Sequence, residues 1–239
     1  MANTVIHKAD TRGKVNHGWL KSFHTFSFAN YFNPERVNFG ALRVLNDDRI
    51  DGGTGFGTHP HDNMEIITIP LEGDLEHKDS MGNVAVIRKG EVQAMSAGTG
   101  IFHSEYNHSK GKPVELLQIW VYPNKRNVEP RYSQIQLNEG EMHNKLAQIL
   151  SPNTDDAGVW IHQDAWFHLG RFEKGFSTEY TIKKAGNGVY AFVIKGDVTI
   201  DGKALSTRDG LGTWNTEKLS ITANSEDVEL LLMEVPMTL

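Results

Sequence analysis

The stretch GTGFGTHPH at residues 53–61 places two histidines one residue apart, behind a glycine-rich approach. Alternate side chains of a β-strand lie on the same face, so His59 and His61 are expected to point in the same direction. Further along the chain, His103-Ser104-Glu105 gives an imidazole and a carboxylate the same spacing, again after a glycine-rich segment. If the two strands face each other inside a barrel, these side chains converge on one point.

Three imidazoles and one carboxylate form a suitable ligand set for one divalent first-row transition metal. In octahedral coordination such a set leaves positions open for a substrate. Without a metal, burying the same groups would leave unpaired polar atoms, which is energetically costly. The bound ion would keep a net positive charge and favour an anionic oxygen, such as that of a deprotonated enol or phenol. We therefore expect one divalent metal per chain, Fe(II) in the first place, with Ni, Co, Mn, Cu or Zn as alternatives.

Composition narrows the classes of protein to which the chain can belong. Its net charge of -6 argues against a nucleic-acid or membrane-surface binder, because either needs a basic patch. No apolar stretch approaches the ~20 residues that span a bilayer. The first residues show no basic segment followed by an apolar one, so we do not expect secretion. Cysteine is absent, which excludes disulfides, iron–sulfur clusters, thiolate zinc sites and cysteine nucleophiles. We therefore expect a cytoplasmic protein.

Short apolar runs separated by glycine turns dominate the chain and predict an all-β barrel or sandwich. The clearest strand candidates are residues 64–71, 83–88, 91–95, 114–122, 189–194 and 228–235. Helical periodicity is weak. Its best candidate, residues 138–150, could equally be a loop that leads into a strand.

A weak internal repeat indicates two related barrels in tandem. The turn LEGDL at residues 71–75 is echoed by IKGDV at 194–198, and VELL at 114–117 recurs at 228–231. Loops between strands absorb the unequal offsets. The second copy keeps the turn glycines but contains neither H-x-H nor H-x-E at the matching places. We therefore expect residues 1–135 to form a metal-binding N-terminal domain, and residues 136–239 a degenerate C-terminal domain without metal.

Most of the other histidines need no function. We expect exposed positions in polar segments for His7, His17, His108 and His143. His162 and His168 have no partner at a spacing suitable for a ligand role. His77 is expected on a surface strand, with the mouth of a barrel as the alternative. His24 lies in the aromatic run FHTFSF at residues 23–28 and is expected either in the core or in a lid.

Two segments resemble the motifs of the cupin superfamily. The first follows the pattern G-x5-H-x-H-x3-E at residues 53–65, although the turn glycine that should follow, Gly73, comes one residue late. The second follows G-x2-H-x3-N at residues 100–107, without the proline usual in that motif.

More specific segments resemble the pirin family, and most closely its bacterial members described as quercetinases. These segments are HPH at residues 59–61, MSAGTGIFHSE at 95–105, HTFSF at 24–28 and LQIWV at 117–121. The resemblance covers essentially the whole chain and is densest through residue 135. It implies an all-β bicupin, with two tandem jelly-roll barrels: an N-terminal metal-binding cupin and a C-terminal degenerate one.

The resemblance also bears on the identity of the carboxylate ligand. In the general cupin pattern the first motif supplies the glutamate, which here falls at Glu65, and strand parity does not exclude that residue. Pirin-like proteins instead take the carboxylate from the second motif, at Glu105. The implied ligands are therefore His59, His61, His103 and Glu105, with Glu65 in a supporting role.

The resemblance to quercetinases implies a metal-dependent dioxygenase that opens a flavonol-like enol with O2 and releases carbon monoxide. Glu105 would assist deprotonation of the substrate as the catalytic base. The candidates for an aromatic pocket wall are Phe28, Phe56, Met64, Phe102 and Trp120. One alternative is a metal- or redox-dependent regulator that binds a transcription-factor or enzyme partner, and a second is a metal-dependent isomerase or hydrolase. We expect a monomer that binds neither nucleic acid nor membrane.

Overall fold

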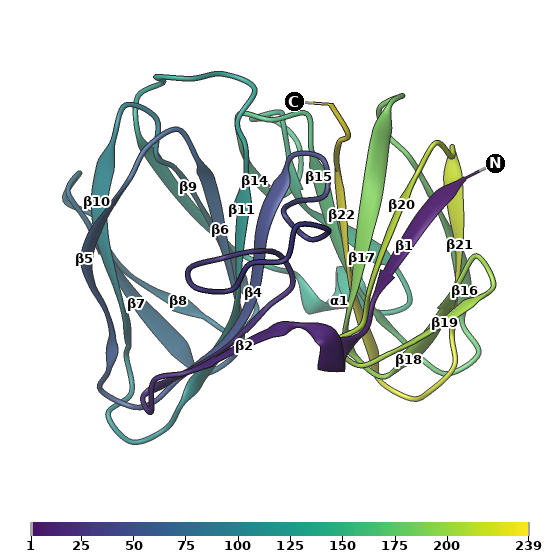
Figure 1. Cartoon of the computed structure of the whole chain (residues 1–239), viewed down its shortest axis with the longest axis horizontal. Helices are drawn as coiled ribbons and strands as arrows, with labels where there is room; N and C mark the ends of the chain where they lie inside the picture. Colours follow the sequence, from purple (N-terminus) through teal and green to yellow (C-terminus); the bar gives the residue numbers. More distant parts are fainter. Residues whose placement is uncertain (1, 239) are drawn as a thin grey trace.

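The computed structural model describes residues 2–238, which form two β-barrels side by side (Figure 1). The N-terminal barrel has a seven-stranded sheet that faces a four-stranded one. In spatial order, the larger sheet contains β12 (Arg131–Gln136), β9 (Glu91–Ser96), β6 (Glu65–Glu72), β11 (Val114–Val121), β4 (Leu42–Ile50), β3 (Leu20–His24) and β2 (Gly13–Asn16). The smaller sheet contains β5 (Gly55–His61), β10 (Ile101–Asn107), β7 (Asp74–Asp79) and β8 (Val84–Arg88).

The C-terminal barrel repeats this plan. Its larger sheet contains β1 (Asn3–His7), β20 (Gly210–Trp214), β17 (Asn187–Lys195), β22 (Val228–Pro236), β15 (Trp166–Phe172), β13 (Leu146–Ser151) and β14 (Val159–Trp160). Its smaller sheet contains β16 (Ser177–Thr181), β21 (Lys218–Ala223), β18 (Asp197–Ile200) and β19 (Lys203–Ser206). The predicted all-β bicupin is confirmed. The matching turn glycines, Gly73 and Gly196, both have positive φ, 75° and 85°, which glycine adopts without strain.

The two large sheets pack against each other and share one hydrophobic core. Odd-numbered residues of β6 and β11, such as Ile67 and Ile119, belong to the same buried cluster as Phe167 of β15 and Leu231 of β22. Side chains alternate between the two faces of a strand, so the even-numbered residues of β6 and β11 face the interior of the N-terminal barrel.

A transverse row of polar side chains crosses that interior. Each residue of the row lies directly opposite the next one on the neighbouring strand. The row consists of His24, Asn46, Gln118, Thr68, Gln93 and Gln134. The C-terminal barrel is filled mainly by an apolar cluster that includes Val189, Leu211 and Leu232, beside the buried Glu234, whose carboxylate accepts a hydrogen bond from Tyr180. The two barrels thus share a fold but not an interior chemistry.

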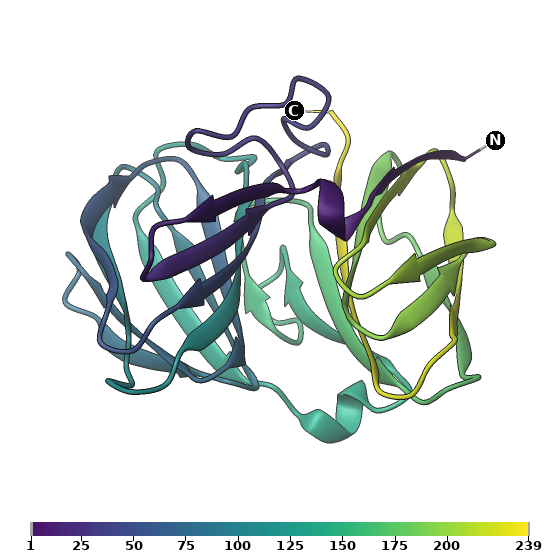
Figure 2. The same cartoon turned by 60° about the horizontal axis from the view of Figure 1, so that its bottom comes forward.

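The N-terminal segment links the two barrels, as Figure 2 shows. Strand β1 pairs with β20 of the C-terminal barrel, the 3-10 turn η1 (Ala9–Thr11) follows, and β2 and β3 then join the N-terminal barrel. His7 is buried in this crossing and hydrogen-bonds through Nδ1 to Tyr190 Oη at 2.8 Å, so the prediction of an exposed His7 was wrong. The predicted domain boundary between residues 135 and 136 stays a prediction. Strand β1 lies before that boundary in the sequence but belongs to the large sheet of the C-terminal barrel.

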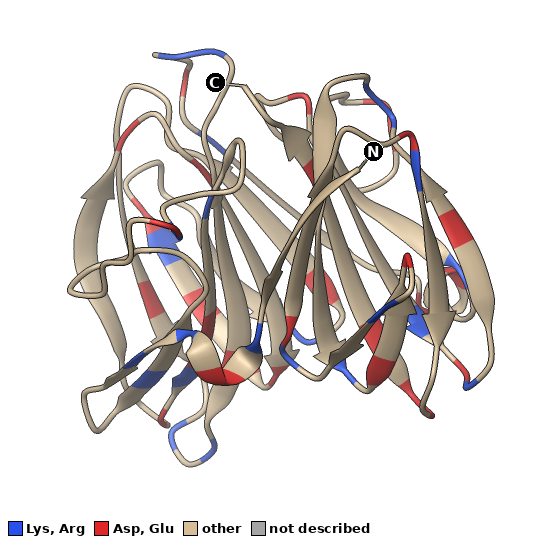
Figure 3. Cartoon of the chain, turned by 45° about the vertical axis from the view of Figure 1, so that its right-hand side comes forward, with Lys and Arg blue, Asp and Glu red and all other residues tan. Residues whose placement is uncertain are grey.

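Of the two predictions for residues 138–150, a helix or a loop that leads into a strand, the structure agrees with the second apart from one short helical turn. A short helix, α1 (Glu139–Met142), is capped by the Asn138 side chain, and the chain then enters strand β13. None of the helices in residues 2–238 is long and apolar enough to cross a membrane. Lysine and arginine are intermixed with aspartate and glutamate along the loops and strands (Figure 3).

Candidate metal centre

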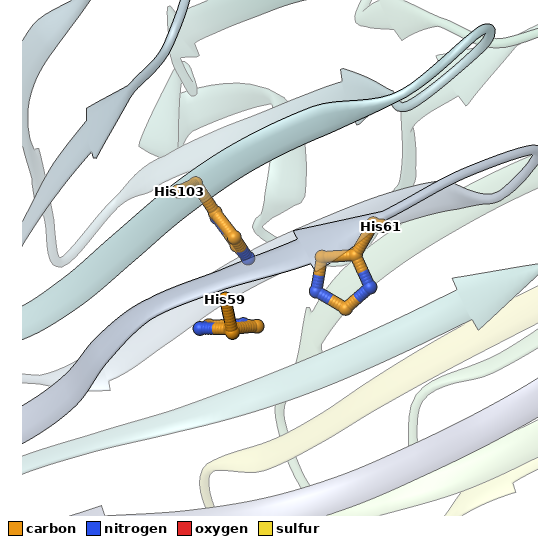
Figure 4. A group of neighbouring side chains, drawn as sticks. All are labelled: His59, His61 and His103. Carbon is orange, nitrogen blue, oxygen red and sulfur yellow. The ribbon is translucent and has the colours of Figure 1, made fainter.

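The histidines of the first and second motifs lie on neighbouring antiparallel strands. In the register of β5 and β10, His59 lies opposite His103 and His61 lies opposite Ile101. The three imidazoles point toward one another, and one ring nitrogen from each lies within 4.8 Å of the others (Figure 4). Among residues 2–238 this is the one cluster of three or more metal-type ligands. The predicted convergence of the two motifs is confirmed for the histidines.

Two of the three candidate ligand nitrogens are free of hydrogen bonds within the protein. His59 Nδ1 lies 2.8 Å from the Gly57 carbonyl oxygen, which can only accept, so Nδ1 carries the proton and Nε2 keeps its lone pair. His103 Nε2 is buried and has no hydrogen-bond partner. Burial lowers the pKa of His61 to about 4 and that of His103 to about 2, and the neighbouring histidines add to both shifts. Neutral imidazoles with free lone pairs fit a divalent metal.

His77 lies within hydrogen-bond distance of His103, on the side of the ring away from Nε2. The His77 side chain is only 1% exposed, and its Nε2 lies 3.1 Å from His103 Nδ1. When His103 Nε2 binds a metal, its Nδ1 carries the proton and donates it to His77 Nε2. The prediction that His77 lies on a surface strand was wrong. Its inward position follows from the pairing of β7 with β10, where His77 lies opposite Glu105.

Glu105 is buried beside the histidines, on the same strand as His103. Both of its carboxylate oxygens accept from Gln118 Nε2 at 3.1 Å, and Gln118 Oε1 in turn accepts from Thr68 Oγ1 at 2.8 Å. Burial raises the pKa of Glu105 to about 7, and the nearby Asp48 adds to the shift. The carboxylate lies outside the group of three ligand nitrogens. It does line the same cavity as His59 and His61.

Glu65 occupies a different environment. Its carboxylate accepts from Ser96 Oγ at 2.7 Å and from a backbone group of His162, a residue of the C-terminal half. As an odd-numbered residue of β6, Glu65 lies on the face of that strand that carries Ile67 into the core between the barrels. Counting residues from His61 does not reveal this, because β5 and β6 belong to different sheets.

A cavity of about 500 Å³ adjoins His59, His61 and Glu105. Of the aromatic residues predicted for its wall, Phe28, Phe56 and Trp120 line it. The other two predictions were wrong. Phe102 is 55% exposed on the outer face of β10, and Met64 packs against the small apolar cluster of Ile66.

Replacing His77 with alanine should weaken metal binding by about 10- to 100-fold, because His103 loses the partner that fixes its tautomer and ring orientation. His77→Gln should restore part of the affinity, since the amide oxygen can still accept from His103 Nδ1. Competition with a chelator for Ni(II) measures the affinities.

His168→Ala is the matched control, because His168 is equally buried but lies in the C-terminal barrel. A folded His77→Ala protein with unchanged metal affinity would contradict the positioning role of His77.

Comparison with known proteins identifies the family. The pirin family profile matches residues 5–121, and the profile of the quercetinase C-terminal cupin domain matches residues 148–235. The chain is 47% identical to the quercetin 2,3-dioxygenase of Escherichia coli K12 over 97% of its own length and 98% of the relative's. It is 39% identical to a pirin-like protein of Caulobacter vibrioides, with 94% and 96% coverage.

The structure likewise superposes on the crystal structure of the bacterial pirin YhhW from Escherichia coli in complex with nickel(II). The TM-score is 0.92 at 46% identity, and the match covers 98% of this chain and 99% of the other. Since the likeness in sequence and in fold extends over nearly the whole of both chains, the protein belongs to the pirin family.

Proposed function

We propose that the protein is a metal-dependent dioxygenase of the quercetinase type, which opens a flavonol-like enol with O2. The proposal depends on one observation: three converging histidines and a buried glutamate lie beside a cavity with aromatic walls. The quercetin 2,3-dioxygenase of Escherichia coli, at 47% identity, supports the reaction class.

The residues present fit a metal. The buried Nε2 of His103 has no partner within the protein, and Nε2 of His59 keeps its lone pair. These two atoms and a ring nitrogen of His61 would hold the ion, and we propose Glu105 as the fourth ligand. When bound, the metal supplies a Lewis acid that favours the deprotonated form of an enol. Nickel(II) in the Escherichia coli pirin supports a divalent ion, and Fe(II) remains our prediction.

The protein's own groups bind the substrate and move its proton. Trp19, Phe28, Phe56 and Trp120 give the cavity apolar walls suited to a flat ring system. Glu105 lies beside the histidines and lines the cavity, where its carboxylate can accept the enol proton, and Gln118 orients the carboxylate for that role. The cavity favours an enzyme over the partner-binding regulator, because a regulator needs no aromatic cavity beside its metal.

Oxygen uptake and carbon monoxide release test the proposal, with quercetin and other flavonols as substrates for Fe(II)-, Ni(II)- and Mn(II)-loaded protein. We expect turnover with at least one of the three metals. A folded protein that holds one metal per chain and consumes no oxygen with any flavonol would rule the proposed function out.

Glu105→Gln should lower turnover about 10²- to 10⁴-fold at saturating metal, because an amide cannot accept a proton at neutral pH although its oxygen can still coordinate weakly. Glu65→Gln is the matched control. It should leave turnover largely intact, since Glu65 bonds to Ser96 on the other side of the sheet. If Glu65→Gln loses the metal while Glu105→Gln keeps both metal and activity, then Glu65 and not Glu105 is the carboxylate ligand.

Elemental analysis should find one tightly bound metal per chain, because the described part of the C-terminal barrel contains no cluster of three or more metal-type ligands. His61→Ala should abolish tight binding, since it removes one of the three imidazoles that converge on the site. Two tightly bound metals per chain would contradict the confinement of the site to the N-terminal barrel.

A further inference from the structure

The cavity has a second polar wall, away from the metal-binding histidines. Strands β3 and β4 form it, with His24 opposite Asn46 and Ser22 opposite Asp48 in their register. All four side chains are buried and line the cavity. None of them belongs to the cluster of metal-type ligands.

Two of these side chains lack hydrogen-bond partners. His24 and Asn46 are each 3% exposed, and neither His24 Nδ1 nor Asn46 Oδ1 has a partner in the protein. Most buried polar atoms in proteins are paired, because an unpaired one costs free energy. Burial lowers the pKa of His24 to about 4, so the ring is neutral and can donate from one nitrogen and accept at the other. Both residues line the cavity, so a small rotation of either side chain turns its polar atom toward a ligand bound there.

The cavity carries no cationic side chain of its own among the described residues. Asp48 and Glu105 both line it, whereas no lysine or arginine of residues 2–238 does. Burial raises the pKa of Asp48 to about 7, and Ser22 Oγ donates a hydrogen bond to its carboxyl. Away from the metal-binding histidines, the described lining offers no cation to pair with a phosphate or carboxylate of a ligand. The wall is therefore suited to an uncharged ligand with hydroxyl groups.

Aromatic rings connect the two ends of the cavity. Trp120 lies edge-on to His61 with ring centroids 4.9 Å apart, Phe28 lies 5.3 Å from Trp120, and His24 lies 5.2 Å from Phe28. A ligand with more than one flat ring can extend along these side chains from the metal-binding histidines to His24. The volume of about 500 Å³ is typical of cavities for such small molecules.

We propose that His24 and Asn46 form a second recognition site, which binds ring hydroxyls of an uncharged polyhydroxylated aromatic ligand while its enol edge faces His59 and His61. This inference rests on the proposed function. It adds that the substrate carries hydroxyl groups on the end that lies away from the metal. A site built to pair with hydroxyls discriminates against a ligand that lacks them, because its own polar atoms are then left unpaired.

Binding of quercetin and of 3-hydroxyflavone to the Ni(II)-loaded protein tests the inference, measured by calorimetry without oxygen. Both ligands carry the same enol edge, but 3-hydroxyflavone has no other ring hydroxyl. The protein should bind quercetin at least about tenfold more tightly. Asn46→Leu and His24→Phe, which roughly preserve side-chain volume, should bring the ratio of the two affinities close to one.

The ratio separates recognition from folding, since general damage to the cavity weakens both ligands together. His168→Phe is the matched control: His168 is also buried, with an unpartnered Nδ1 and an aromatic neighbour, Tyr180, but it lies in the C-terminal barrel. That variant should keep the wild-type ratio.

The inference is overturned if the variants at His24 and Asn46 keep the wild-type preference, or if neither flavonol binds the wild-type protein. Oxygen uptake, measured separately, distinguishes the two proposals. If the protein turns over quercetin but the variants keep the wild-type ratio of affinities, the recognition site alone is disproved. If the ratio of affinities falls to about one in the variants but the wild-type protein consumes no oxygen with flavonols, the dioxygenase proposal alone is disproved.

Discussion

The antiparallel pairing of β5 with β10 is the constraint on which the rest of the site depends. It sets His59 opposite His103, and strand alternation then brings His61 to the same face. The facing sheet completes the arrangement, because Gln118 reaches across the barrel to hold the carboxylate of Glu105. A slip of one residue in the pairing of β5 would turn both of its histidines outward and remove the site.

The two barrels show how one fold can carry two different interiors. The C-terminal barrel buries an apolar cluster, as a stable β-sandwich normally does. The N-terminal barrel instead carries a polar row across its interior, and several atoms of that row, including Gln93 Nε2, have no partner. Unpaired buried groups lower stability, and proteins retain such departures chiefly at functional sites. Three residues of that row, His24, Asn46 and Gln118, line the cavity beside His59 and His61.

Much of the fold and part of the site follow from sequence alone. Strand segments, turn glycines and the H-x-H spacing depend on local patterns, so they are visible in the chain. The inward position of His77 and the direction in which Glu65 faces depend on which strands pair, and local spacing does not contain that information. Phe102 is a different case. It is adjacent to His103 on one strand, so alternation alone already places it on the outer face.

Anomalous diffraction from crystals of the metal-loaded protein, recorded at the absorption edge of the bound metal, tests the central claim most directly. Our account predicts one peak per chain inside the N-terminal barrel, bound by Nε2 of His59, Nε2 of His103, His61 and the carboxylate of Glu105. A peak bound by Glu65 instead of Glu105, or a peak inside the C-terminal barrel, would contradict it.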